Sequence, residues 1–126
     1  MNDLYANEAY ERWGQTESYK ESQKQLAKYS KVDIESASAQ MKAATDLVKE
    51  ALLNGESPDS DLATKGAEAH RQSISQWWYE CDYQIHKNLA QMYIADERFK
   101  KNYEDQAPGL AQFIHDAIFA NAVAHE

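Results

Sequence analysis

Cys81 is the residue of this sequence whose side chain is best suited to covalent chemistry. In a helix, Trp77 would lie one turn before it on the same side and Trp78 would border that face, so large aromatic rings would surround the thiol. Glu80 and Asp82 flank the cysteine and disfavour its thiolate, and no Lys or Arg lies within one helical turn. The spacing alone therefore favours a buried, inert thiol over a reactive one.

The histidines do not form the spacing of a metal site on one helix, because they occupy positions 70, 86, 115 and 125. His70 falls on an apolar helix face, where we expect a hydrogen-bonded core residue. A haem would need an axial histidine in an apolar pocket, and neither His70 nor His86 has that context. The sequence also lacks a phosphate-binding glycine loop, a Cys-x-x-Cys pair and a visible acid–base pair. It predicts no metal, haem or other cofactor, and an enzyme is the weakest interpretation.

The composition is that of one globular domain, with 126 residues, 43% of them hydrophobic and 27% charged. Thirteen basic against 21 acidic residues give a net charge of −8, which argues against direct binding of nucleic acid or of an anionic membrane. A single cysteine cannot form an intramolecular disulfide, which fits a reducing compartment. The start of the chain lacks the features of a signal peptide, and no apolar run approaches the ~20 residues of a membrane span. The sequence thus predicts a soluble, cytoplasmic protein.

Glycines, prolines and capping residues divide the chain into helices, and no stretch has the period-two pattern of a strand. Ser30 and Asp33 have the spacing of a capping box at the start of a long helix. The apolar pattern from residue 61 to residue 92 is long for one helix, so we expect a break near residues 80–83. The predicted fold is all-α, with helices over residues 3–13, 16–29, 30–55, 61–92 with that break, 96–103 and from 108 onward.

The first 31 residues differ from the rest in their apolar content. They contain no Ile, Val or Phe, and only Leu4 and Leu26 are large aliphatic residues, yet they hold four Tyr and one Trp. Helices gain most of their stability from a packed apolar face, so these should be marginal alone. We expect one ligand-binding domain over residues 1–126, with residues 1–31 as lid helices and 32–126 as the core. Ordinary surface helices with tyrosines at the rim are the alternative.

Several segments, in this order and spacing, resemble the TipAS antibiotic-recognition domain, the effector-binding half of a subgroup of MerR-type transcription activators. The resemblance runs from about Tyr10 to the C-terminus. The segments that carry it are Glu11-Arg12-Trp13-Gly14-Gln15-Thr16, His70-Arg71-Gln72, Tyr79-Glu80-Cys81-Asp82-Tyr83-Gln84-Ile85-His86, Met92-Tyr93-Ile94-Ala95-Asp96-Glu97-Arg98-Phe99, Pro108-Gly109-Leu110-Ala111 and Asp116-Ala117-Ile118-Phe119-Ala120-Asn121-Ala122.

This resemblance implies a globin-like helical domain without haem that recognises bulky peptide antibiotics, cyclic thiopeptides above all. In thiopeptide-binding members a cysteine in a Tyr-acidic-Cys-x-Tyr context adds to a dehydroalanine of the ligand, and Cys81 matches that position. It would act once, as a capture nucleophile, and not as a turnover catalyst. The candidate ligand-binding residues are Cys81, Trp77, Trp78, Tyr79, Tyr83 and His70, with Trp13 and Tyr10 closing from the other side; no residue is a candidate for catalysis.

The resemblance also implies a partner half that binds DNA in a full-length parent, of which this chain would be an excised domain or a natural short form. Alone it would bind and sequester antibiotic, and joined to that half it would report the antibiotic to a promoter as part of multidrug recognition. A helical protein–protein interaction or dimerisation domain with an inert Cys81 is the alternative. Only specific ligand binding would raise the melting temperature, so an added antibiotic distinguishes the two.

Overall fold

The computed structural model describes residues 17–126, which form helices joined by short connections and contain no strand. The helices are α2 (Glu17–Lys28), α3 (Lys31–Leu53), α4 (Asp61–Trp77), α5 (Tyr83–Ala95), α6 (Glu97–Glu104) and α7 (Leu110–Ala124). The all-α prediction is confirmed. The predicted helix over residues 3–13, together with Tyr10 and Trp13, lies outside the described residues.

The helix starts that the sequence predicted are confirmed by their capping geometry. At α3 the Asp33 amide donates to Ser30 Oγ (3.2 Å) and the Ser30 amide donates to Asp33 Oδ2 (3.0 Å), which completes the capping box. The Asp96 carboxylate caps α6. At the start of α7, Gly109 takes a φ of +87°, a left-handed conformation that favours glycine. Local capping residues therefore set where these helices begin.

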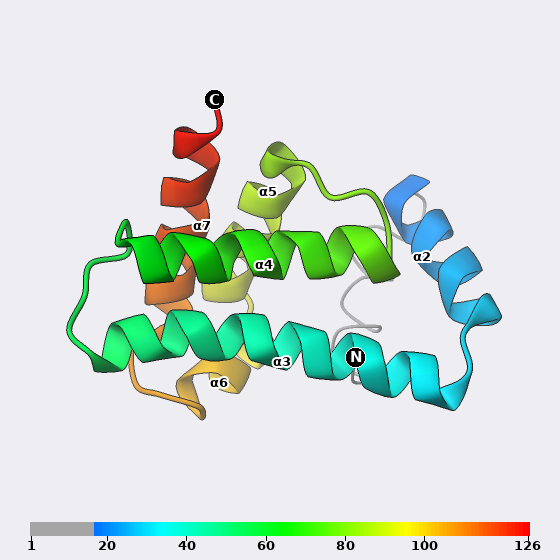
Figure 1. Cartoon of the computed structure of the whole chain (residues 1–126), viewed down its shortest axis with the longest axis horizontal. Helices are drawn as coiled ribbons and strands as arrows, with labels where there is room; N and C mark the ends of the chain where they lie inside the picture. Colours follow the sequence, from blue (N-terminus) through cyan, green and yellow to red (C-terminus); the bar gives the residue numbers. More distant parts are fainter. Residues whose placement is uncertain (1–16) are drawn as a thin grey trace.

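Helices α3 and α4 run antiparallel and form one layer, and α5 and α7 cross behind them (Figure 1). The two front helices approach closely at Gly66 of α4. A Cβ at that position would lie 2.7 Å from Val48 Cγ2 and 2.9 Å from the Val48 backbone nitrogen. Since only glycine lacks a Cβ, Gly66 fixes how near the two helix backbones can lie.

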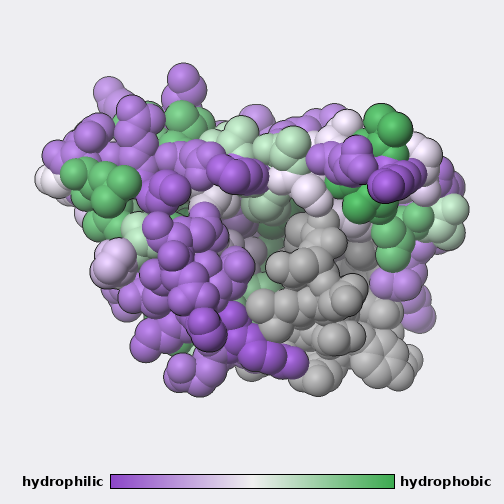
Figure 2. Space-filling model, turned by 90° about the horizontal axis from the view of Figure 1, so that it is seen from below, coloured by the Kyte–Doolittle hydropathy of each residue, from purple (hydrophilic) through white to green (hydrophobic). Residues whose placement is uncertain are grey.

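Helix α7 is the centre of the core, because it packs against α3, α4, α5 and α6. Eight of its residues are buried, and Ile114, Ala117 and Ile118 are fully enclosed. Figure 2, seen from below, shows that the described residues on this face are mostly hydrophilic, with apolar residues in patches towards its two sides. Among residues 17–126, every buried core residue lies in α3 or after it.

Candidate functional site

The long helical stretch breaks between α4 and α5, as the sequence predicted, although the break begins earlier than expected. Helix α4 ends at Trp77, and α5 starts at Tyr83 after residues 78–82, which we call the connection. The Asp82 carboxylate caps α5 by accepting from the Ile85 amide (2.8 Å). Cys81 therefore lies in a non-helical segment, bounded by two helix ends.

Because of this break, residues 77–81 do not form one helical turn, and the spacing that predicted aromatic rings around Cys81 does not apply. Trp77 and Trp78 lie at the end of α4, where Tyr29 contacts both rings edge-on at 5.4 Å and 5.9 Å between centroids. The hydroxyl of Tyr29 also donates to the Trp77 carbonyl, and Trp77 Nε1 donates to Gln40 Oε1 (2.8 Å). The tryptophans thus form an aromatic cluster with Tyr29, between α4 and the turn from α2 to α3.

The backbone of Cys81 is held by side chains of α4. Its amide donates to Ser75 Oγ (2.9 Å), and its carbonyl accepts from Ser75 Oγ (3.1 Å) and from Arg71 Nη1 (2.8 Å). Sequence reasoning missed both contacts, because a cation ten residues away reaches Cys81 only after the chain turns back. No Lys or Arg lies within one helical turn of Cys81, and the cation that reaches its backbone is Arg71.

The thiol of Cys81 is fully buried. The pKa of Cys81 is raised to about 12, mainly by burial; the charge of Arg71 lowers it, and the charges of Asp82 and Glu68 raise it. In this conformation the thiol is neither accessible nor ionised, so it is not a ready nucleophile. The preference of the spacing for a buried thiol is confirmed for this state.

Arg71 belongs to a charged cluster that the sequence did not reveal. Its Nε and Nη2 donate to the two carboxylate oxygens of Glu68 (3.1 and 2.6 Å), a bidentate pair. Asn121 Nδ2 of α7 donates to Glu68 Oε1 (2.9 Å), and the hydroxyl of Tyr83 donates to Oε2 (3.3 Å). Burial alone would raise the pKa of Glu68, but these hydrogen bonds and the Arg71 charge lower it to about 2.

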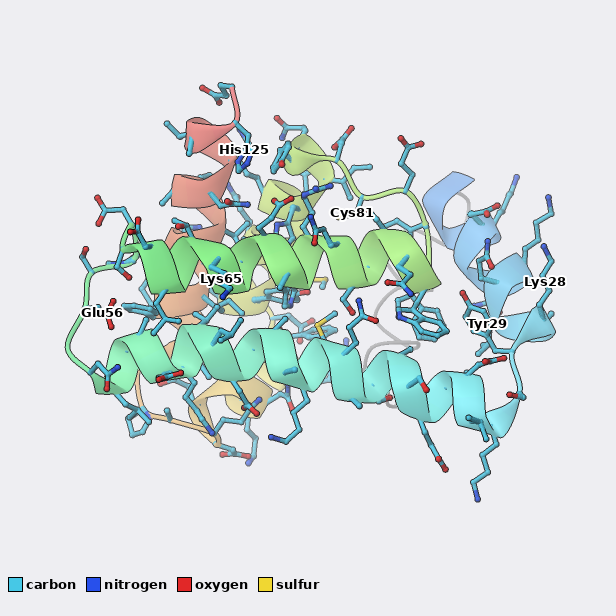
Figure 3. All side chains as sticks on the ribbon, in the orientation of Figure 1. Lys28, Tyr29, Glu56, Lys65, Cys81 and His125 are labelled. Atoms are coloured by element: carbon cyan, nitrogen blue, oxygen red, sulfur yellow. The ribbon has the colours of Figure 1, made fainter. Side chains whose placement is uncertain are left out.

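Tyr83 joins this cluster to the C-terminal end of α7. The Arg71 guanidinium lies 4.3 Å from the centre of the Tyr83 ring, a cation–π contact. The Tyr83 ring also stacks on the His125 ring, with 4.7 Å between the ring centroids and 13° between the planes. Figure 3 shows Cys81 and His125 on the same side of α4, away from Tyr29 at its far end. The cluster and the Tyr29 aromatic cluster are therefore separate regions.

His70 and His86 form a buried pair between α4 and α5. His70 Nδ1 and His86 Nε2 are 2.9 Å apart, and the Tyr103 hydroxyl of α6 lies 3.5 Å from His70 Nε2. Burial lowers the pKa of both histidines, and the neighbouring His70 and Arg71 charges lower that of His86 further. The expectation that His70 is a hydrogen-bonded core residue is confirmed, and a fully buried His70 offers no surface to a ligand in this state.

Of the eight residues proposed from the sequence, six lie in the described part of the chain. Trp78 and Tyr79 are buried, whereas Trp77 and Tyr83 are partly exposed. Tyr83 shares the Arg71 cluster with the backbone of Cys81, and Trp77 and Trp78 share the aromatic cluster. Within residues 17–126 no group of three His, Cys, Asp or Glu side chains is arranged to hold a metal ion.

The fold and site together define the class of protein. It is an all-α domain whose single cysteine lies in a connection between two helices, held by a charged cluster at the core's edge. In the described range no helix has the length and apolar content to cross a membrane. The family model described as the TipAS antibiotic-recognition domain matches residues 5–121, and the chain belongs to this family.

Known relatives and solved structures agree with this assignment. The chain is 41% identical over 123 residues to the HTH-type transcriptional activators TipA of Streptomyces coelicolor and Streptomyces lividans, covering 98% of this chain and 49% of each relative. It is 30% identical over 114 residues to the HTH-type transcriptional activator mta of Bacillus subtilis, covering 90% of this chain and 43% of that protein. The chain thus spans about half the length of the curated relatives it matches.

Two solved structures share the fold. One is TipAS from Streptomyces lividans in complex with nosiheptide, a thiopeptide antibiotic, with a TM-score of 0.86, 41% identity, and coverage of 98% of this chain and 86% of that chain. The other is the antibiotic-binding domain of a TipA-class multidrug resistance transcriptional regulator, with a TM-score of 0.65, 40% identity, and coverage of 71% and 95%.

Proposed function

We propose that this chain binds bulky peptide antibiotics of the thiopeptide class and serves as the effector-sensing domain of a drug-responsive transcription activator. The observation that carries the proposal is the likeness to TipAS in complex with nosiheptide, which extends over 98% of the chain at 41% identity. Neither substrate turnover nor direct DNA contact is part of this role. A DNA-binding half in a longer parent, working in the cytoplasm, would convert binding into transcription.

The ligand would contact the two ends of the connection. Partly exposed aromatic side chains border each end, Trp77 on one side and Tyr83 on the other, with Trp78, Tyr79 and Cys81 buried between them. Flat aromatic rings stack well on the heterocycles of a thiopeptide, and this stacking needs no charge on the ligand. His70 lies deeper and would support this surface instead of touching the ligand.

Cys81 would bond to the ligand only after binding has opened the connection. In the bonding step the thiolate sulfur would form a C–S bond to the methylene carbon of a dehydroalanine, and the neighbouring carbon would take up a proton, so that no group leaves. A buried thiol whose pKa is raised to about 12 does not do this at neutral pH. Recognition would therefore come first and covalent capture second.

Residues 1–31 would close over the bound antibiotic as a lid. Their shortage of aliphatic anchors supports this, as does the contact of Tyr29 with Trp77 and Trp78, which ties the end of this segment to the aromatic cluster. Ordering such a segment costs roughly 1–2 kcal/mol per residue in backbone entropy, which ligand contacts would offset. Hydrogen exchange should show greater protection of residues 1–31 with nosiheptide than without it; equal protection would contradict the lid.

A titration with nosiheptide tests the proposed function. Tryptophan fluorescence should change on binding, because Trp77 borders the connection and Trp78 belongs to it. The melting temperature should rise, since a ligand at 100 times its Kd stabilises the native state by about 2.7 kcal/mol. An aminoglycoside, which is polar and lacks aromatic rings, serves as the control. Neither a fluorescence change nor a thermal shift with nosiheptide would refute antibiotic binding and favour a protein–protein interaction domain.

Replacement of Cys81 separates recognition from capture. Cys81→Ser should keep most of the reversible affinity for nosiheptide, because stacking and burial supply it, but should give no covalent adduct in an intact-mass spectrum. Wild type should accumulate an adduct on long incubation at raised pH. Binding without any adduct in the wild type would exclude capture, and loss of reversible binding in Cys81→Ser would exclude the two-step order.

A further inference from the structure

The backbone polar groups of Cys81 are satisfied by side chains and not by a helix. The carbonyl accepts hydrogen bonds from Arg71 Nη1 (2.8 Å) and Ser75 Oγ (3.1 Å), and the amide donates to the same Ser75 oxygen (2.9 Å). The position of the connection therefore depends on two side chains of α4. Without these hydrogen bonds, the amide and carbonyl of Cys81 would have no other hydrogen-bond partner among residues 17–126.

Arg71 is held rigidly in place to make this contact. Glu68 binds two of its nitrogens, and the Tyr83 ring lies against its guanidinium at 4.3 Å. Asn121 of α7 in turn fixes Glu68 from the other side (2.9 Å). Three helices, α4, α5 and α7, thus orient one guanidinium towards the carbonyl of one residue. The direction of the guanidinium, and with it the hydrogen bond to the Cys81 carbonyl, therefore depends on the whole cluster.

The thiol itself contributes little to keeping the connection closed. Its sulfur makes one weak hydrogen bond, 3.8 Å to the Asp82 carbonyl, and the neighbouring Glu80 and Asp82 are exposed. Movement of the connection away from α4 would therefore turn Cys81 outward without breaking a strong bond to sulfur. The barrier to exposure comes from the Arg71 and Ser75 hydrogen bonds and from the burial of the neighbouring aromatic rings.

We propose that Arg71 is a positioning residue which, with Ser75 and Glu68, forms a latch that keeps Cys81 buried and unreactive until the connection opens. The inference deepens the proposed function, and rests on it only for the ligand whose binding would open the latch. In the closed state the latch protects the thiol from electrophiles of every kind. Opening it exposes the cysteine beside Trp77 and Tyr83, the aromatic residues proposed to meet the antibiotic.

The test measures alkylation of Cys81 by iodoacetamide, followed by intact mass, in the full chain without antibiotic. In this reaction the thiolate sulfur forms a bond to carbon as iodide leaves, and the thiol proton goes to solvent. Arg71→Gln should react at least roughly tenfold faster than wild type, because it removes a charge-assisted hydrogen bond to the carbonyl. Arg98→Gln, which removes an exposed arginine paired with Asp96 on α6, should react within roughly twofold of wild type.

The direction of the change in alkylation rate shows whether Arg71 acts by holding the connection or only through its charge. The positive charge of Arg71 lowers the pKa of Cys81, so its removal would slow alkylation if charge were its only contribution. Faster alkylation supports the latch, and equal or slower alkylation in Arg71→Gln overturns it. Ser75→Ala, which keeps the charge and removes two hydrogen bonds, should also react faster, and it decides the question if Arg71→Gln does not fold.

Urea denaturation excludes an indirect effect through global unfolding. It gives the loss of global stability in each variant, and alkylation of Cys81 must accelerate by more than that loss predicts. An equal acceleration would mean that Cys81 reacts only through global unfolding, and it would overturn the latch.

The latch and the proposed function can fail separately. Faster alkylation of Arg71→Gln in a chain that does not bind nosiheptide would support the latch and refute antibiotic binding. Nosiheptide binding, together with an alkylation rate that does not change in Arg71→Gln or Ser75→Ala, would support antibiotic binding and refute the latch.

Discussion

Glu68 offers the sharpest test of how the charged cluster stabilises the domain, through the substitution Glu68→Gln. The glutamine keeps the shape of the side chain but loses the charge. Its NH2 group, a hydrogen-bond donor, would take the place of one carboxylate oxygen and face groups that are themselves donors. Arg71 and Asn121 would then lack part of the acceptor they share. We expect the free energy of unfolding to fall at pH 7, because a partly buried arginine loses its partner.

The size of the effect follows from the pKa of Glu68, which the cluster lowers from an ordinary 4.5 to about 2. At about 1.4 kcal/mol per pH unit this lowering corresponds to roughly 3 kcal/mol. The side chain is 22% exposed, so solvent screening reduces the figure, and we expect about 2 kcal/mol. Because the folded-state pKa is lowered, this contribution is complete above about pH 4.5 and is lost as the pH falls from there to about 2.

The assay is urea denaturation of wild type and Glu68→Gln, followed by tryptophan fluorescence from pH 7 to pH 3. The difference in unfolding free energy should stay near 2 kcal/mol down to about pH 5 and fall below half of that by pH 3. Other titrating groups cancel in the difference between the two proteins. Glu35→Gln, at an exposed position of α3, should stay within about 0.5 kcal/mol of wild type. A difference that does not change with pH, or no difference at pH 7, would refute the stabilising role of the Glu68 charge.

Three further predictions concern helix packing, buried histidines and α2. Gly66→Ala should destabilise the protein by about 2 kcal/mol in urea denaturation, because its Cβ would meet the Val48 backbone and overpacking outweighs the better helix propensity; unchanged stability would mean that α3 and α4 can separate freely. Burial lowers the pKa of His70 and His86, so unfolding takes up protons and stability should fall as the pH drops below about 6.5; His86→Leu should make that slope shallower, and an unchanged slope would count against the buried pair. Tyr29→Phe removes the hydrogen bond to the last residue of α4 and should cost about 1 kcal/mol, with faster hydrogen exchange in α2; unchanged exchange would show that the ring contacts alone hold it.

The helices were predictable from the sequence because their boundaries depend on local chemistry. Ser30 with Asp33, Asp96 before α6 and Gly109 before α7 each act on residues within one turn, so spacing along the chain is enough to identify them. The break before Tyr83 was predictable as well, because an uninterrupted helix of about thirty residues would not fit in a domain this small. Length and capping together therefore gave the element order.

The surroundings of Cys81 were not predictable in the same way. Helical spacing placed Trp77 and Trp78 around the thiol, but α4 ends at Trp77, so the register on which that placement depended does not continue to residue 81. The contacts that replace it come from Arg71 and Ser75, through hydrogen bonds to a backbone carbonyl, an acceptor that every residue carries and no sequence pattern marks. Contacts of that kind depend on the path of the chain, which only the structure shows.

The buried histidine pair has a consequence for where its protons lie. If the Tyr103 hydroxyl donates to His70 Nε2, then His70 Nδ1 must donate to His86 Nε2, and His86 is left with a proton on Nδ1; reversing one bond reverses the other. In both arrangements His86 Nδ1 is buried and finds no partner among residues 17–126. The tautomers of the two imidazoles are therefore coupled, and the chain of hydrogen bonds runs in one of two opposite directions. A reversal of the hydrogen bond at Tyr103 of α6 would move the proton onto or off His86 Nδ1 of α5.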